Sequence, residues 1–358
     1  MSVLLFRGPV LPDGEARDLY VVDGHVTYEP QPGAEVAAEG WIVPGLVDAH
    51  CHAGLDADGA VDEATTEQQL IADRDAGALL LRDCGSPADT SWVHDREDLP
   101  RLRRAGRHIA RTRRYIRNFA HEVEPGEVAA YVAQAAQRGD GWVKLVGDWI
   151  EREAGDLRPS FPAETFAEAI RVAHEHGARV TAHVFGEEAL PMLLDAGIDC
   201  LEHGTGLSEG LIAQMVENQV ALVPTVRQLE NFPSYASQAG GKFPVYAEHM
   251  TRLYESRHRT LGAAYDAGVR IYAGTDAGGV LPHGLIAEEV EMLRDVIGMS
   301  RHDALGAASW HAREWLGMPS GLDEGDPADL VVYAADPLAD LRALAEPARV
   351  VLRGRIVA

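Results

Sequence analysis

Cysteine and positive charge are both scarce in this sequence of 358 residues. The three cysteines, Cys51, Cys84 and Cys200, lie far apart and form no CxxC pair, so neither a disulfide framework nor a zinc knuckle is expected. The formal net charge of -24 argues against nucleic acid and against anionic membrane surfaces as partners.

Long apolar runs are missing as well. No uninterrupted run approaches the length of a membrane span, and the N-terminal "MSVLLFRGPVLPDG" has neither the apolar length nor the cleavage site of a signal peptide. The apolar fraction of 46% is typical of a soluble globular protein. We therefore expect a cytoplasmic protein that acts on a small molecule, and the composition is compatible with a homo-oligomer.

Lysine is the rarest charged residue. Of the 32 basic residues only Lys144 and Lys242 are lysine, and the other 30 are arginine. Where a plain positive charge suffices, this chain uses arginine. A lysine in the middle of "WVKLV", which reads as a buried strand, therefore needs a reason of its own.

One pattern is abundant: a polar amphipathic segment, a small residue with glycine, and then a short apolar run. It occurs in "RDAGALLLRD", "RRAGRHIART", "HEHGARVTAH", "LDAGIDCLEH" and "YDAGVRIYAGT". Glycine after a helix takes the left-handed cap conformation, and the apolar run that follows is a buried strand. With "WIVPGLVDAH", "WVKLVGD" and "QVALVPTV" the count reaches eight strands between residues 42 and 275, which predicts an α/β fold closed as a (β/α)8 TIM barrel. The rival, a doubly wound sheet, lacks a Gly-rich dinucleotide turn after its first strand.

The two ends of the chain have a different character. "DLYVVDGHVTYEP" predicts a hairpin around Asp-Gly, and "ADLVVYAADP" and "ARVVLRGRIVA" are also β-rich. We therefore predict a small β-sandwich domain built from 1–42 plus 323–358, beside a barrel domain over 43–322. The stretch 227–244 has the most loop-like composition and is a candidate lid after the seventh strand.

Polar side chains gather at the predicted carboxyl ends of the barrel strands, where such folds carry their catalytic groups. The candidates at this rim are His50, His52, Lys144, His183, His203 and Asp276. The two histidines of "HCH" share one face because alternate strand residues do so. Imidazoles with a carboxylate suit a zinc-like divalent metal, although manganese or cobalt can substitute. A single strand-end histidine is more often an ordinary polar residue, so it is the coincidence of the set that indicates a metal site.

The segments "PGLVDAHCH", "VTAHVFG", "LEHG" and "AGTDAG" resemble the metal-binding strands of the amidohydrolase superfamily. The branch is that of the Xaa-Pro dipeptidase and imidazolonepropionase-like metal-dependent hydrolases. The resemblance covers nearly the whole chain, since "EGDPADLVVYAADPLAD" is similar to the terminal β segment of that family. The chain departs from the family at "VGDWIE", in place of a Gly-rich turn, and at "NFAH", in place of a glycine pair before a histidine.

The resemblance implies a binuclear amidohydrolase that cleaves an amide, peptide or lactam-like C–N bond through a metal-bridging hydroxide. The ligand sets that it implies are His50, His52 and Asp276 for one divalent ion, His183 and His203 for the other, and Lys144, carboxylated by carbon dioxide, between them. Zinc is the expected metal, and Asp276 the general base and then acid. A neutral lysine amine can form such a carbamate, whereas the arginine guanidinium stays protonated. The alternative is a core lysine paired with Asp148 or Asp276.

The arginine-rich stretch after the third strand suggests substrate contacts. Eight arginines lie between residues 101 and 117. The first of them are expected on the helix that enters the third strand, whereas "RRYIRNFAHE" follows the strand, at the active-site rim. Arginine holds carboxylates bidentately, so these side chains suit a carboxylate-bearing substrate or, equally, pairing with surface acids. The substrate-binding candidates are Arg113, Arg114, Tyr115, Arg117, His121 and His283.

Three other functions compete with this interpretation. A mononuclear zinc deaminase or cyclic-amide hydrolase of the same superfamily is the nearest, but Gly186 occupies the place of its usual glutamate and Glu187 comes one residue late. "GLSEG" fits the serine-hydrolase motif, yet Ser208 lies too far from the preceding strand and is better read as a helix N-cap. A non-catalytic metal-binding scaffold is the third, although no expected ligand is missing.

Overall fold

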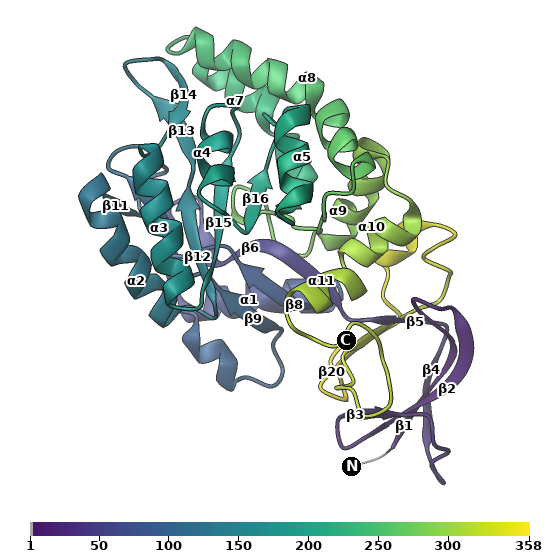
Figure 1. Ribbon diagram of the computed structural model, residues 1–358. Coiled ribbons are helices and arrows are strands. Elements are labelled where there is room, and N and C mark those ends of the chain that lie inside the picture. The colour runs from purple at the N-terminus through teal and green to yellow at the C-terminus, as the bar shows by residue number, and fades with distance from the viewer. Residues whose placement is uncertain (1–2) are drawn as a thin grey trace.

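The centre of the chain forms two sheets of mainly parallel strands in the computed structural model, which describes residues 3–358. Their orders are β18-β6-β8-β9, with β7 beside β6, and β11-β10-β12-β15-β16-β17 (Figure 1). A separate hairpin pairs β13 with β14. The bounds are β6 Leu46–Asp56, β7 Gly59–Ala60, β8 Ala78–Asp83, β9 Arg101–Arg104, β10 Ile109–Arg111, β11 His121–Val123, β12 Trp142–Val146, β13 Asp148–Glu151, β14 Asp156–Pro159, β15 Arg179–Val184, β16 Cys200–His203, β17 Ala221–Val223 and β18 Ala277–Gly279.

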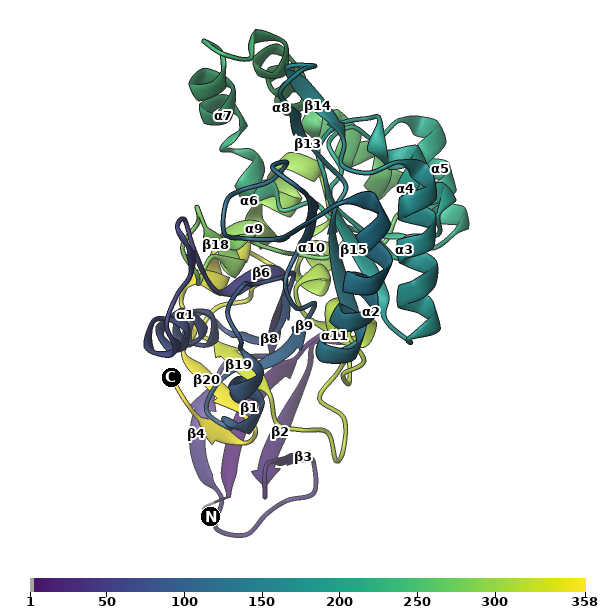
Figure 2. The same ribbon diagram turned by 90° about the vertical axis from the view of Figure 1, so that its left-hand side faces the viewer.

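Helices alternate with these strands, and α2 to α5 form one layer outside β15 (Figure 2). Gly77, Gly177, Gly197 and Gly268 follow helices with positive φ and release the chain into the next strand, as the repeated sequence pattern predicts. No helix within residues 3–358 has the length and apolar character needed to cross a bilayer. The α-helices are α1 Glu63–Asp75, α2 Val128–Arg138, α3 Ala163–Glu175, α4 Ala189–Asp195, α5 Glu209–Glu217, α6 Val226–Leu229, α7 Phe232–Ala239, α8 Pro244–Asp266, α9 Ile286–Met292, α10 Arg301–Ala307 and α11 Trp310–Trp315. Shorter turns are η1 Ser91–Asp95, η2 Pro125–Glu127, the π-helical η3 Leu293–Ile297 and η4 Leu341–Ala345.

Backbone hydrogen bonds join the two central sheets along both edges. On one side, residues 271–276 lie between β17 and β6: Tyr272 N donates to Leu222 O at 3.0 Å, and Ala49 N donates to Ala273 O at 2.8 Å. On the other side, the segment carrying β9 and β10 pairs first with β8 and then with β12. One apolar cluster draws side chains from β6, β8, β12, β16 and β17, so these strands share an interior.

A further sheet combines strands from both ends of the chain. Its order is β21-β20-β19-β5-β1-β2-β3, and β4 pairs with β1, which forks between β4 and β5. Its two halves share one apolar core, and Figure 1 shows it beside the central strands with the chain termini close by. The predicted Asp-Gly hairpin is confirmed, since Asp23 and Gly24 both have positive φ between β2 and β3. The bounds are β1 Leu4–Val10, β2 Glu15–Val22, β3 His25–Thr27, β4 Glu35–Glu39, β5 Trp41–Pro44, β19 Leu330–Tyr333, β20 Arg349–Leu352 and β21 Arg355–Ile356.

Three local predictions from the sequence are wrong. "WIVPGLVDAH" is two strands, because the chain leaves the terminal sheet after Pro44 and enters β6 at Leu46. The arginines at 101–104 lie on strand β9 and not on a helix. The candidate lid 227–244 is mostly helical: α6 and α7 form there because α7 packs against α8, an interaction that its Gly, Pro and Asn composition does not reveal.

Candidate active site

The six residues predicted as ligands line one cavity, His183 and His203 from the carboxyl ends of β15 and β16, and His50, His52 and Lys144 from within β6 and β12. His50 and His52 project from β6 with their Nε2 atoms 3.3 Å apart. Oδ1 of Asp276, which follows the 271–275 segment, lies 3.0 Å from the first nitrogen and 2.9 Å from the second. These three side chains have ligand atoms close enough together to hold one cation.

His183 and His203 form a second group of ligand atoms, on β15 and β16. Nδ1 of His183 lies 3.0 Å from Nε2 of His203. The other ring nitrogen of His203, Nδ1, lies 2.7 Å from Thr225 Oγ1. Because the Thr225 hydroxyl donates to Pro224 O, it accepts the proton of His203 Nδ1, and the lone pair of Nε2 is left facing His183.

Backbone strain is concentrated at this site. The φ angles of His203, Thr225 and Asp276 are 66°, 47° and 57°, in the left-handed region that residues other than glycine rarely adopt. For a β-branched residue such as Thr225 this conformation is especially unfavourable. Such conformations persist where the surrounding structure enforces them, and they cluster at active sites.

Burial sets the protonation state of the ligands. It lowers the pKa of His50, lowers that of His203 to about 3 and lowers that of His183 well below its usual value. Burial opposes ionisation of Asp276, but the neighbouring His50 and His52 outweigh it and hold the pKa of that carboxyl well below its usual range. At neutral pH His50, His183 and His203 are therefore neutral and the carboxylate is ionised, as divalent metal binding requires.

Lys144 is buried between the two ligand groups and forms an ion pair with Glu202. The partner is neither of the two carboxylates considered from the sequence, Asp148 and Asp276. Asp148 instead accepts hydrogen bonds from the backbone N–H groups of Phe185 and Gly186. Glu202 also accepts a hydrogen bond from Thr181 Oγ1 at 2.7 Å. A protonated Lys144 thus has a fully buried anion beside it.

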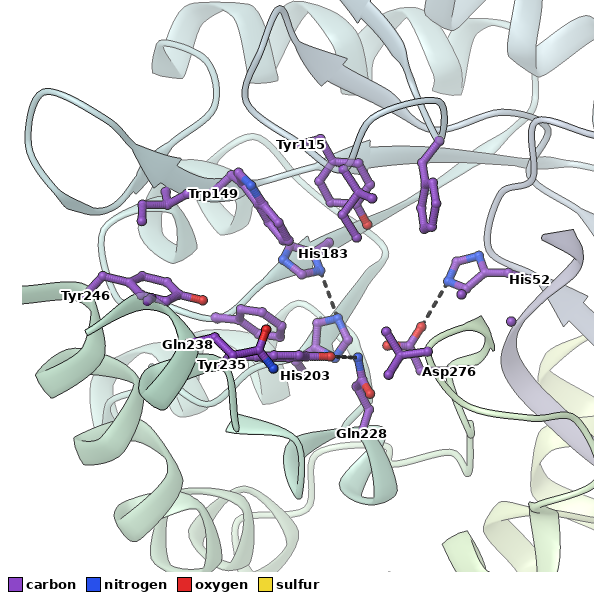
Figure 3. Close-up of a pocket in the computed structure, with 18 of the residues that line it drawn as sticks. His52, Tyr115, Trp149, His183, His203, Gln228, Tyr235, Gln238, Tyr246 and Asp276 are labelled. Carbon is purple, nitrogen blue, oxygen red and sulfur yellow. Dashed lines mark hydrogen bonds and ion pairs between the residues drawn. The ribbon is translucent and has the colours of Figure 1, made fainter. Parts of the chain in front are cut away.

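A cavity of about 460 Å³ lies over these residues. Besides the ligands, its wall is largely aromatic, with Tyr115 and Trp149 on one side and Tyr235 and Tyr246 across from them (Figure 3). The full set of other lining side chains is Tyr115, Ile116, Phe119, Trp149, Ile150, Phe185, Gln228, Tyr235, Gln238, Ala239, Lys242, Phe243, Tyr246 and Val280. The site therefore favours a small substrate with apolar or aromatic parts.

Of the predicted substrate-binding residues, only Tyr115 lines this cavity. Arg113 and Arg117 are exposed and do not line it, and Arg114 donates to the carbonyl oxygens of Pro159 and Arg158. Arg113 and Asn118 both have positive φ, so the segment that carries Tyr115 is irregular at these two residues.

The two histidines proposed for substrate contact are also elsewhere. His121 lines a separate depression with Arg107 and Arg138. Nδ1 of His283 lies 2.7 Å from Asp73 Oδ2, which ties the 281–284 turn to α1. One histidine beside the site is not predicted from the sequence: His108 is buried and stacks on His52 with ring centroids 5.0 Å apart.

The cavity is covered by a lid, which we define as α7, the turn 240–243 and α8. His249 on α8 fastens the lid: its Nδ1 lies 2.8 Å from Asp156 on β14, and its Nε2 lies 2.8 Å from Glu187. The hydrogen bond to Glu187 is the main cause that raises the pKa of His249, and it lowers the pKa of Glu187 to about 2. The backbone N–H of Tyr246 also donates to Gly155 O at 3.1 Å.

Comparison with known proteins places the chain among hydrolases. Residues 41–357 match the sequence profile of the amidohydrolase family. An uncharacterized protein of Mycobacterium tuberculosis strain H37Rv is 55% identical over 351 residues, covering 98% of this chain and 94% of that protein. Ochratoxinase from Aspergillus niger is 29% identical over 231 residues, which cover 62% of this chain and 46% of that enzyme. The crystal structure of a Xaa-Pro dipeptidase with bound methionine superposes with a TM-score of 0.83 at 20% identity and covers 99% of both chains.

Glu202→Gln tests the charge on Lys144. In metal-free protein the substitution leaves a buried ammonium without its anion, so we expect a loss of about 3–5 kcal/mol in the free energy of unfolding, as when a buried pair is broken. In zinc-loaded protein the loss should be much smaller if Lys144 carries the carbamate that the family resemblance implies, because the lysine then has no positive charge. Urea unfolding of both forms measures the two losses. Thr181→Val, which removes only a hydrogen bond to Glu202, should affect both forms alike, and equal losses for Glu202→Gln would mean that Lys144 stays an ammonium.

The stability of the lid should depend on pH through His249. Its pKa is raised on folding, so its contribution is complete below about 6.5, the unfolded value, and is lost as pH rises through the higher folded pKa. The contribution of Glu187 is complete above about 4.5 and is lost as pH falls toward 2. His249→Gln should therefore speed limited proteolysis of the lid at pH 5.5 to 6.5, a window set by these two pKa shifts. The difference from wild type should shrink in alkaline solution. His258→Gln, an exposed change on the same helix, is the control, and a wild-type cleavage rate in His249→Gln at every pH would contradict the fastening role.

Proposed function

The chain belongs to the amidohydrolase family of hydrolases that act on carbon–nitrogen bonds, and from this premise we propose a binuclear metal-dependent amidohydrolase. It would cleave an amide, peptide or lactam-like bond in a small substrate. The observation that carries the proposal is the convergence of four imidazoles, one carboxylate and one lysine at the floor of a single cavity.

We also propose a closed (β/α)8 barrel as the frame of this site. The proposal is supported by the hydrogen bonds that join both edges of the two central sheets and by the shared apolar interior. The division into a barrel domain, 43–322, and a small β-sandwich domain, 1–42 plus 323–358, is part of the same proposal. The cytoplasmic location, the small-molecule partner and the oligomeric state stay predictions from the sequence.

The donor set fits two divalent cations. Nε2 of His203 and Nδ1 of His183 are 3.0 Å apart, and two imidazole lone pairs at that distance repel unless a cation or a proton lies between them. The same holds for His50 and His52, whose Nε2 atoms share Asp276 Oδ1. His52 Nδ1 lies 2.7 Å from Gly85 O, which keeps the proton on Nδ1 and leaves Nε2 as the ligand atom. Nitrogen and carboxylate donors of this kind suit zinc.

The residues that would hold the ions follow from the family resemblance and agree with these distances. They are His50, His52 and Asp276 for one ion, and His183 and His203 for the other, with Lys144 between the two groups. When bound, divalent cations lower the pKa of a coordinated water from 15.7 to about 7 and polarise a carbonyl oxygen.

Asp276 is the group that moves protons. Its carboxylate is ionised at neutral pH, lies against His50 and His52, and lines the cavity, so it can accept a proton from the attacking water and pass it to the leaving nitrogen. The aromatic wall restricts water and orients the apolar parts of the substrate.

Lys144 would act as a carbamate. Its neutral amine nitrogen adds to the carbon of carbon dioxide and loses one proton, which gives an anion with two oxygens in place of a cation. The burial of Lys144 between the two histidine groups supports this state, and so does the choice of lysine in a chain that otherwise uses arginine.

The mononuclear deaminase fits the structure less well. The glutamate that such enzymes place after the fifth strand is absent, because Gly186 occupies that position. Its neighbour Glu187 is bound to His249 and to Arg252 on the lid and does not line the cavity. Ser208 is the N-cap of α5 and accepts a hydrogen bond from Leu211 N, so the serine-hydrolase motif is structural.

Lys144 variants test the metal centre. We expect the zinc-loaded wild type to bind two ions per chain and to hydrolyse at least one class among dipeptides, N-acyl amino acids, lactams and cyclic ureides. Lys144→Ala and Lys144→Arg should both lose most bound metal and nearly all activity, because neither side chain forms a carbamate. Metal content by mass spectrometry and turnover on the same samples give the answer. Two ions and normal turnover in Lys144→Arg would exclude the carbamate, and partial rescue of Lys144→Ala by a short carboxylic acid would support it.

Asp276→Asn separates proton transfer from folding. The variant should fold and bind zinc at high zinc concentration. Its kcat should fall by about two to four powers of ten, since general acid–base catalysis is lost together with one ligand. Circular dichroism, metal content and kcat measured together distinguish loss of chemistry from loss of structure. Wild-type turnover would remove Asp276 from the mechanism.

A further inference from the structure

Both lysines of this chain line the same cavity. Lys144 lies at its floor, buried and paired with Glu202. Lys242 is exposed on the lid, where it makes no ion pair with any carboxylate of residues 3–358, and its Nζ lies 5.0 Å from the ring centroid of Phe243. No arginine lines the cavity. Lys242 is therefore the one cation in the wall that is free to meet a substrate.

The backbone that carries Lys242 is held in place. Lys242 N and Phe243 N both donate to Ala239 O, at 2.9 and 2.7 Å, which closes the turn between α7 and α8. The contacts of α8 with Gly155, Asp156 and Glu187 then fix this turn over the site. A lysine on an ordered turn gives up less freedom when it binds a ligand than one on a mobile loop.

The charges and surfaces around Lys242 define what it would bind. Its neighbours in the cavity wall are the aromatic Phe243, Tyr246 and Tyr235 and the neutral Gln238. Asp276 is an ionised carboxylate at the floor of the cavity. Among the described side chains of the wall, Lys242 at the lid is the counter-charge open to an anionic group on the substrate, in a protein whose net charge of -24 repels anions elsewhere.

We propose that Lys242 selects substrates that carry an anionic group, most simply a carboxylate, together with an aromatic or other apolar part that contacts the cavity wall. The proposal rests on the proposed amide hydrolysis for the identity of the scissile bond, but not for the recognition itself. Lys242, which lines the cavity, thus takes the role in substrate binding that the sequence suggested for the arginines after the third strand, which do not line it.

Two matched probes test the selection: N-benzoyl-L-phenylalanine and N-benzoylphenethylamine, which share the amide and both rings and differ by one carboxylate. Isothermal titration calorimetry with metal-free protein measures binding without turnover. We expect wild type to bind the acid about tenfold more tightly than its neutral counterpart, the usual effect of one charge-assisted contact. Lys242→Met should abolish this preference and Lys242→Arg should keep most of it. Arg259→Met, which removes one exposed positive charge from α8 outside the cavity, should leave it unchanged.

Kinetics on zinc-loaded protein provide a second readout. Lys242→Met should raise KM for the acid about tenfold, with little change in kcat and little change for the neutral amide, because the contact is made equally in the bound substrate and in the transition state. The inference is overturned if wild type shows no preference for the acid, or if Lys242→Met retains it. Binding that depends on Lys242, together with no hydrolysis of these probes or of any dipeptide, lactam or cyclic ureide, would contradict the proposed function alone. Hydrolysis of both probes that is unaffected by Lys242→Met would contradict the inference alone.

Discussion

The structure depends on holding pairs of imidazole nitrogens about 3 Å apart in a buried place, where each pair needs a proton or a cation between its two nitrogens. The imidazole nitrogens of His183 and His203, and those of His50 and His52, converge in this way. Without compensation such an arrangement is unfavourable, so the surrounding structure must enforce it. His203 and Asp276 are held in left-handed backbone conformations, so the surrounding structure constrains the backbone at these two residues.

Buried carboxylates behind the strand ends hold much of this backbone in position through hydrogen bonds. Asp48 accepts from His50 N and from the Thr275 hydroxyl, at 3.0 and 2.5 Å, and so ties β6 to the segment that presents Asp276. Burial raises the pKa of Asp48 to about 7 and that of Glu289 to about 8. Glu289 accepts from the backbone N–H groups of Val226 and Arg227 and fixes the start of α6 beside the strained Thr225. These groups touch no substrate, yet they determine where the ligands lie.

The convergence of the six candidate ligands could be predicted from the sequence because strand ends are local features. Alternation along a strand places His50 and His52 together, and parallel strands bring their carboxyl ends to one rim. The residues of the cavity wall are harder to predict from the sequence, because they lie on turns whose path depends on tertiary contacts. Arg113 is exposed in a segment with two positive φ angles that the residue types do not indicate, and α7 is helical because it packs on α8.

Glu202 shows most clearly what the pattern of a strand conceals. Cys200 and Glu202 alternate onto the inner face of β16, where the latter meets Lys144 and Thr181. By the same alternation His203 should point outward, and only its positive φ returns the ring to the site. If the side chain of His203 is assigned to the inner face of the strand from the sequence, alternation assigns Glu202 to the outer face. Glu202 is then not recognised as the partner of Lys144.

The positions of Lys144 and Lys242 give a physical reason for the use of lysine instead of arginine there. At the floor, between four imidazoles, a fixed guanidinium would bring a permanent charge to the place where cations are to bind, whereas a lysine can lose its charge or pair with Glu202. At the lid, a compact ammonium on a flexible stem can follow an anion whose position varies among substrates, while the fork of arginine demands one bidentate geometry. Arginine meets every other need for positive charge in this chain, and lysine is kept for the two places where the charge must be either removable or adaptable.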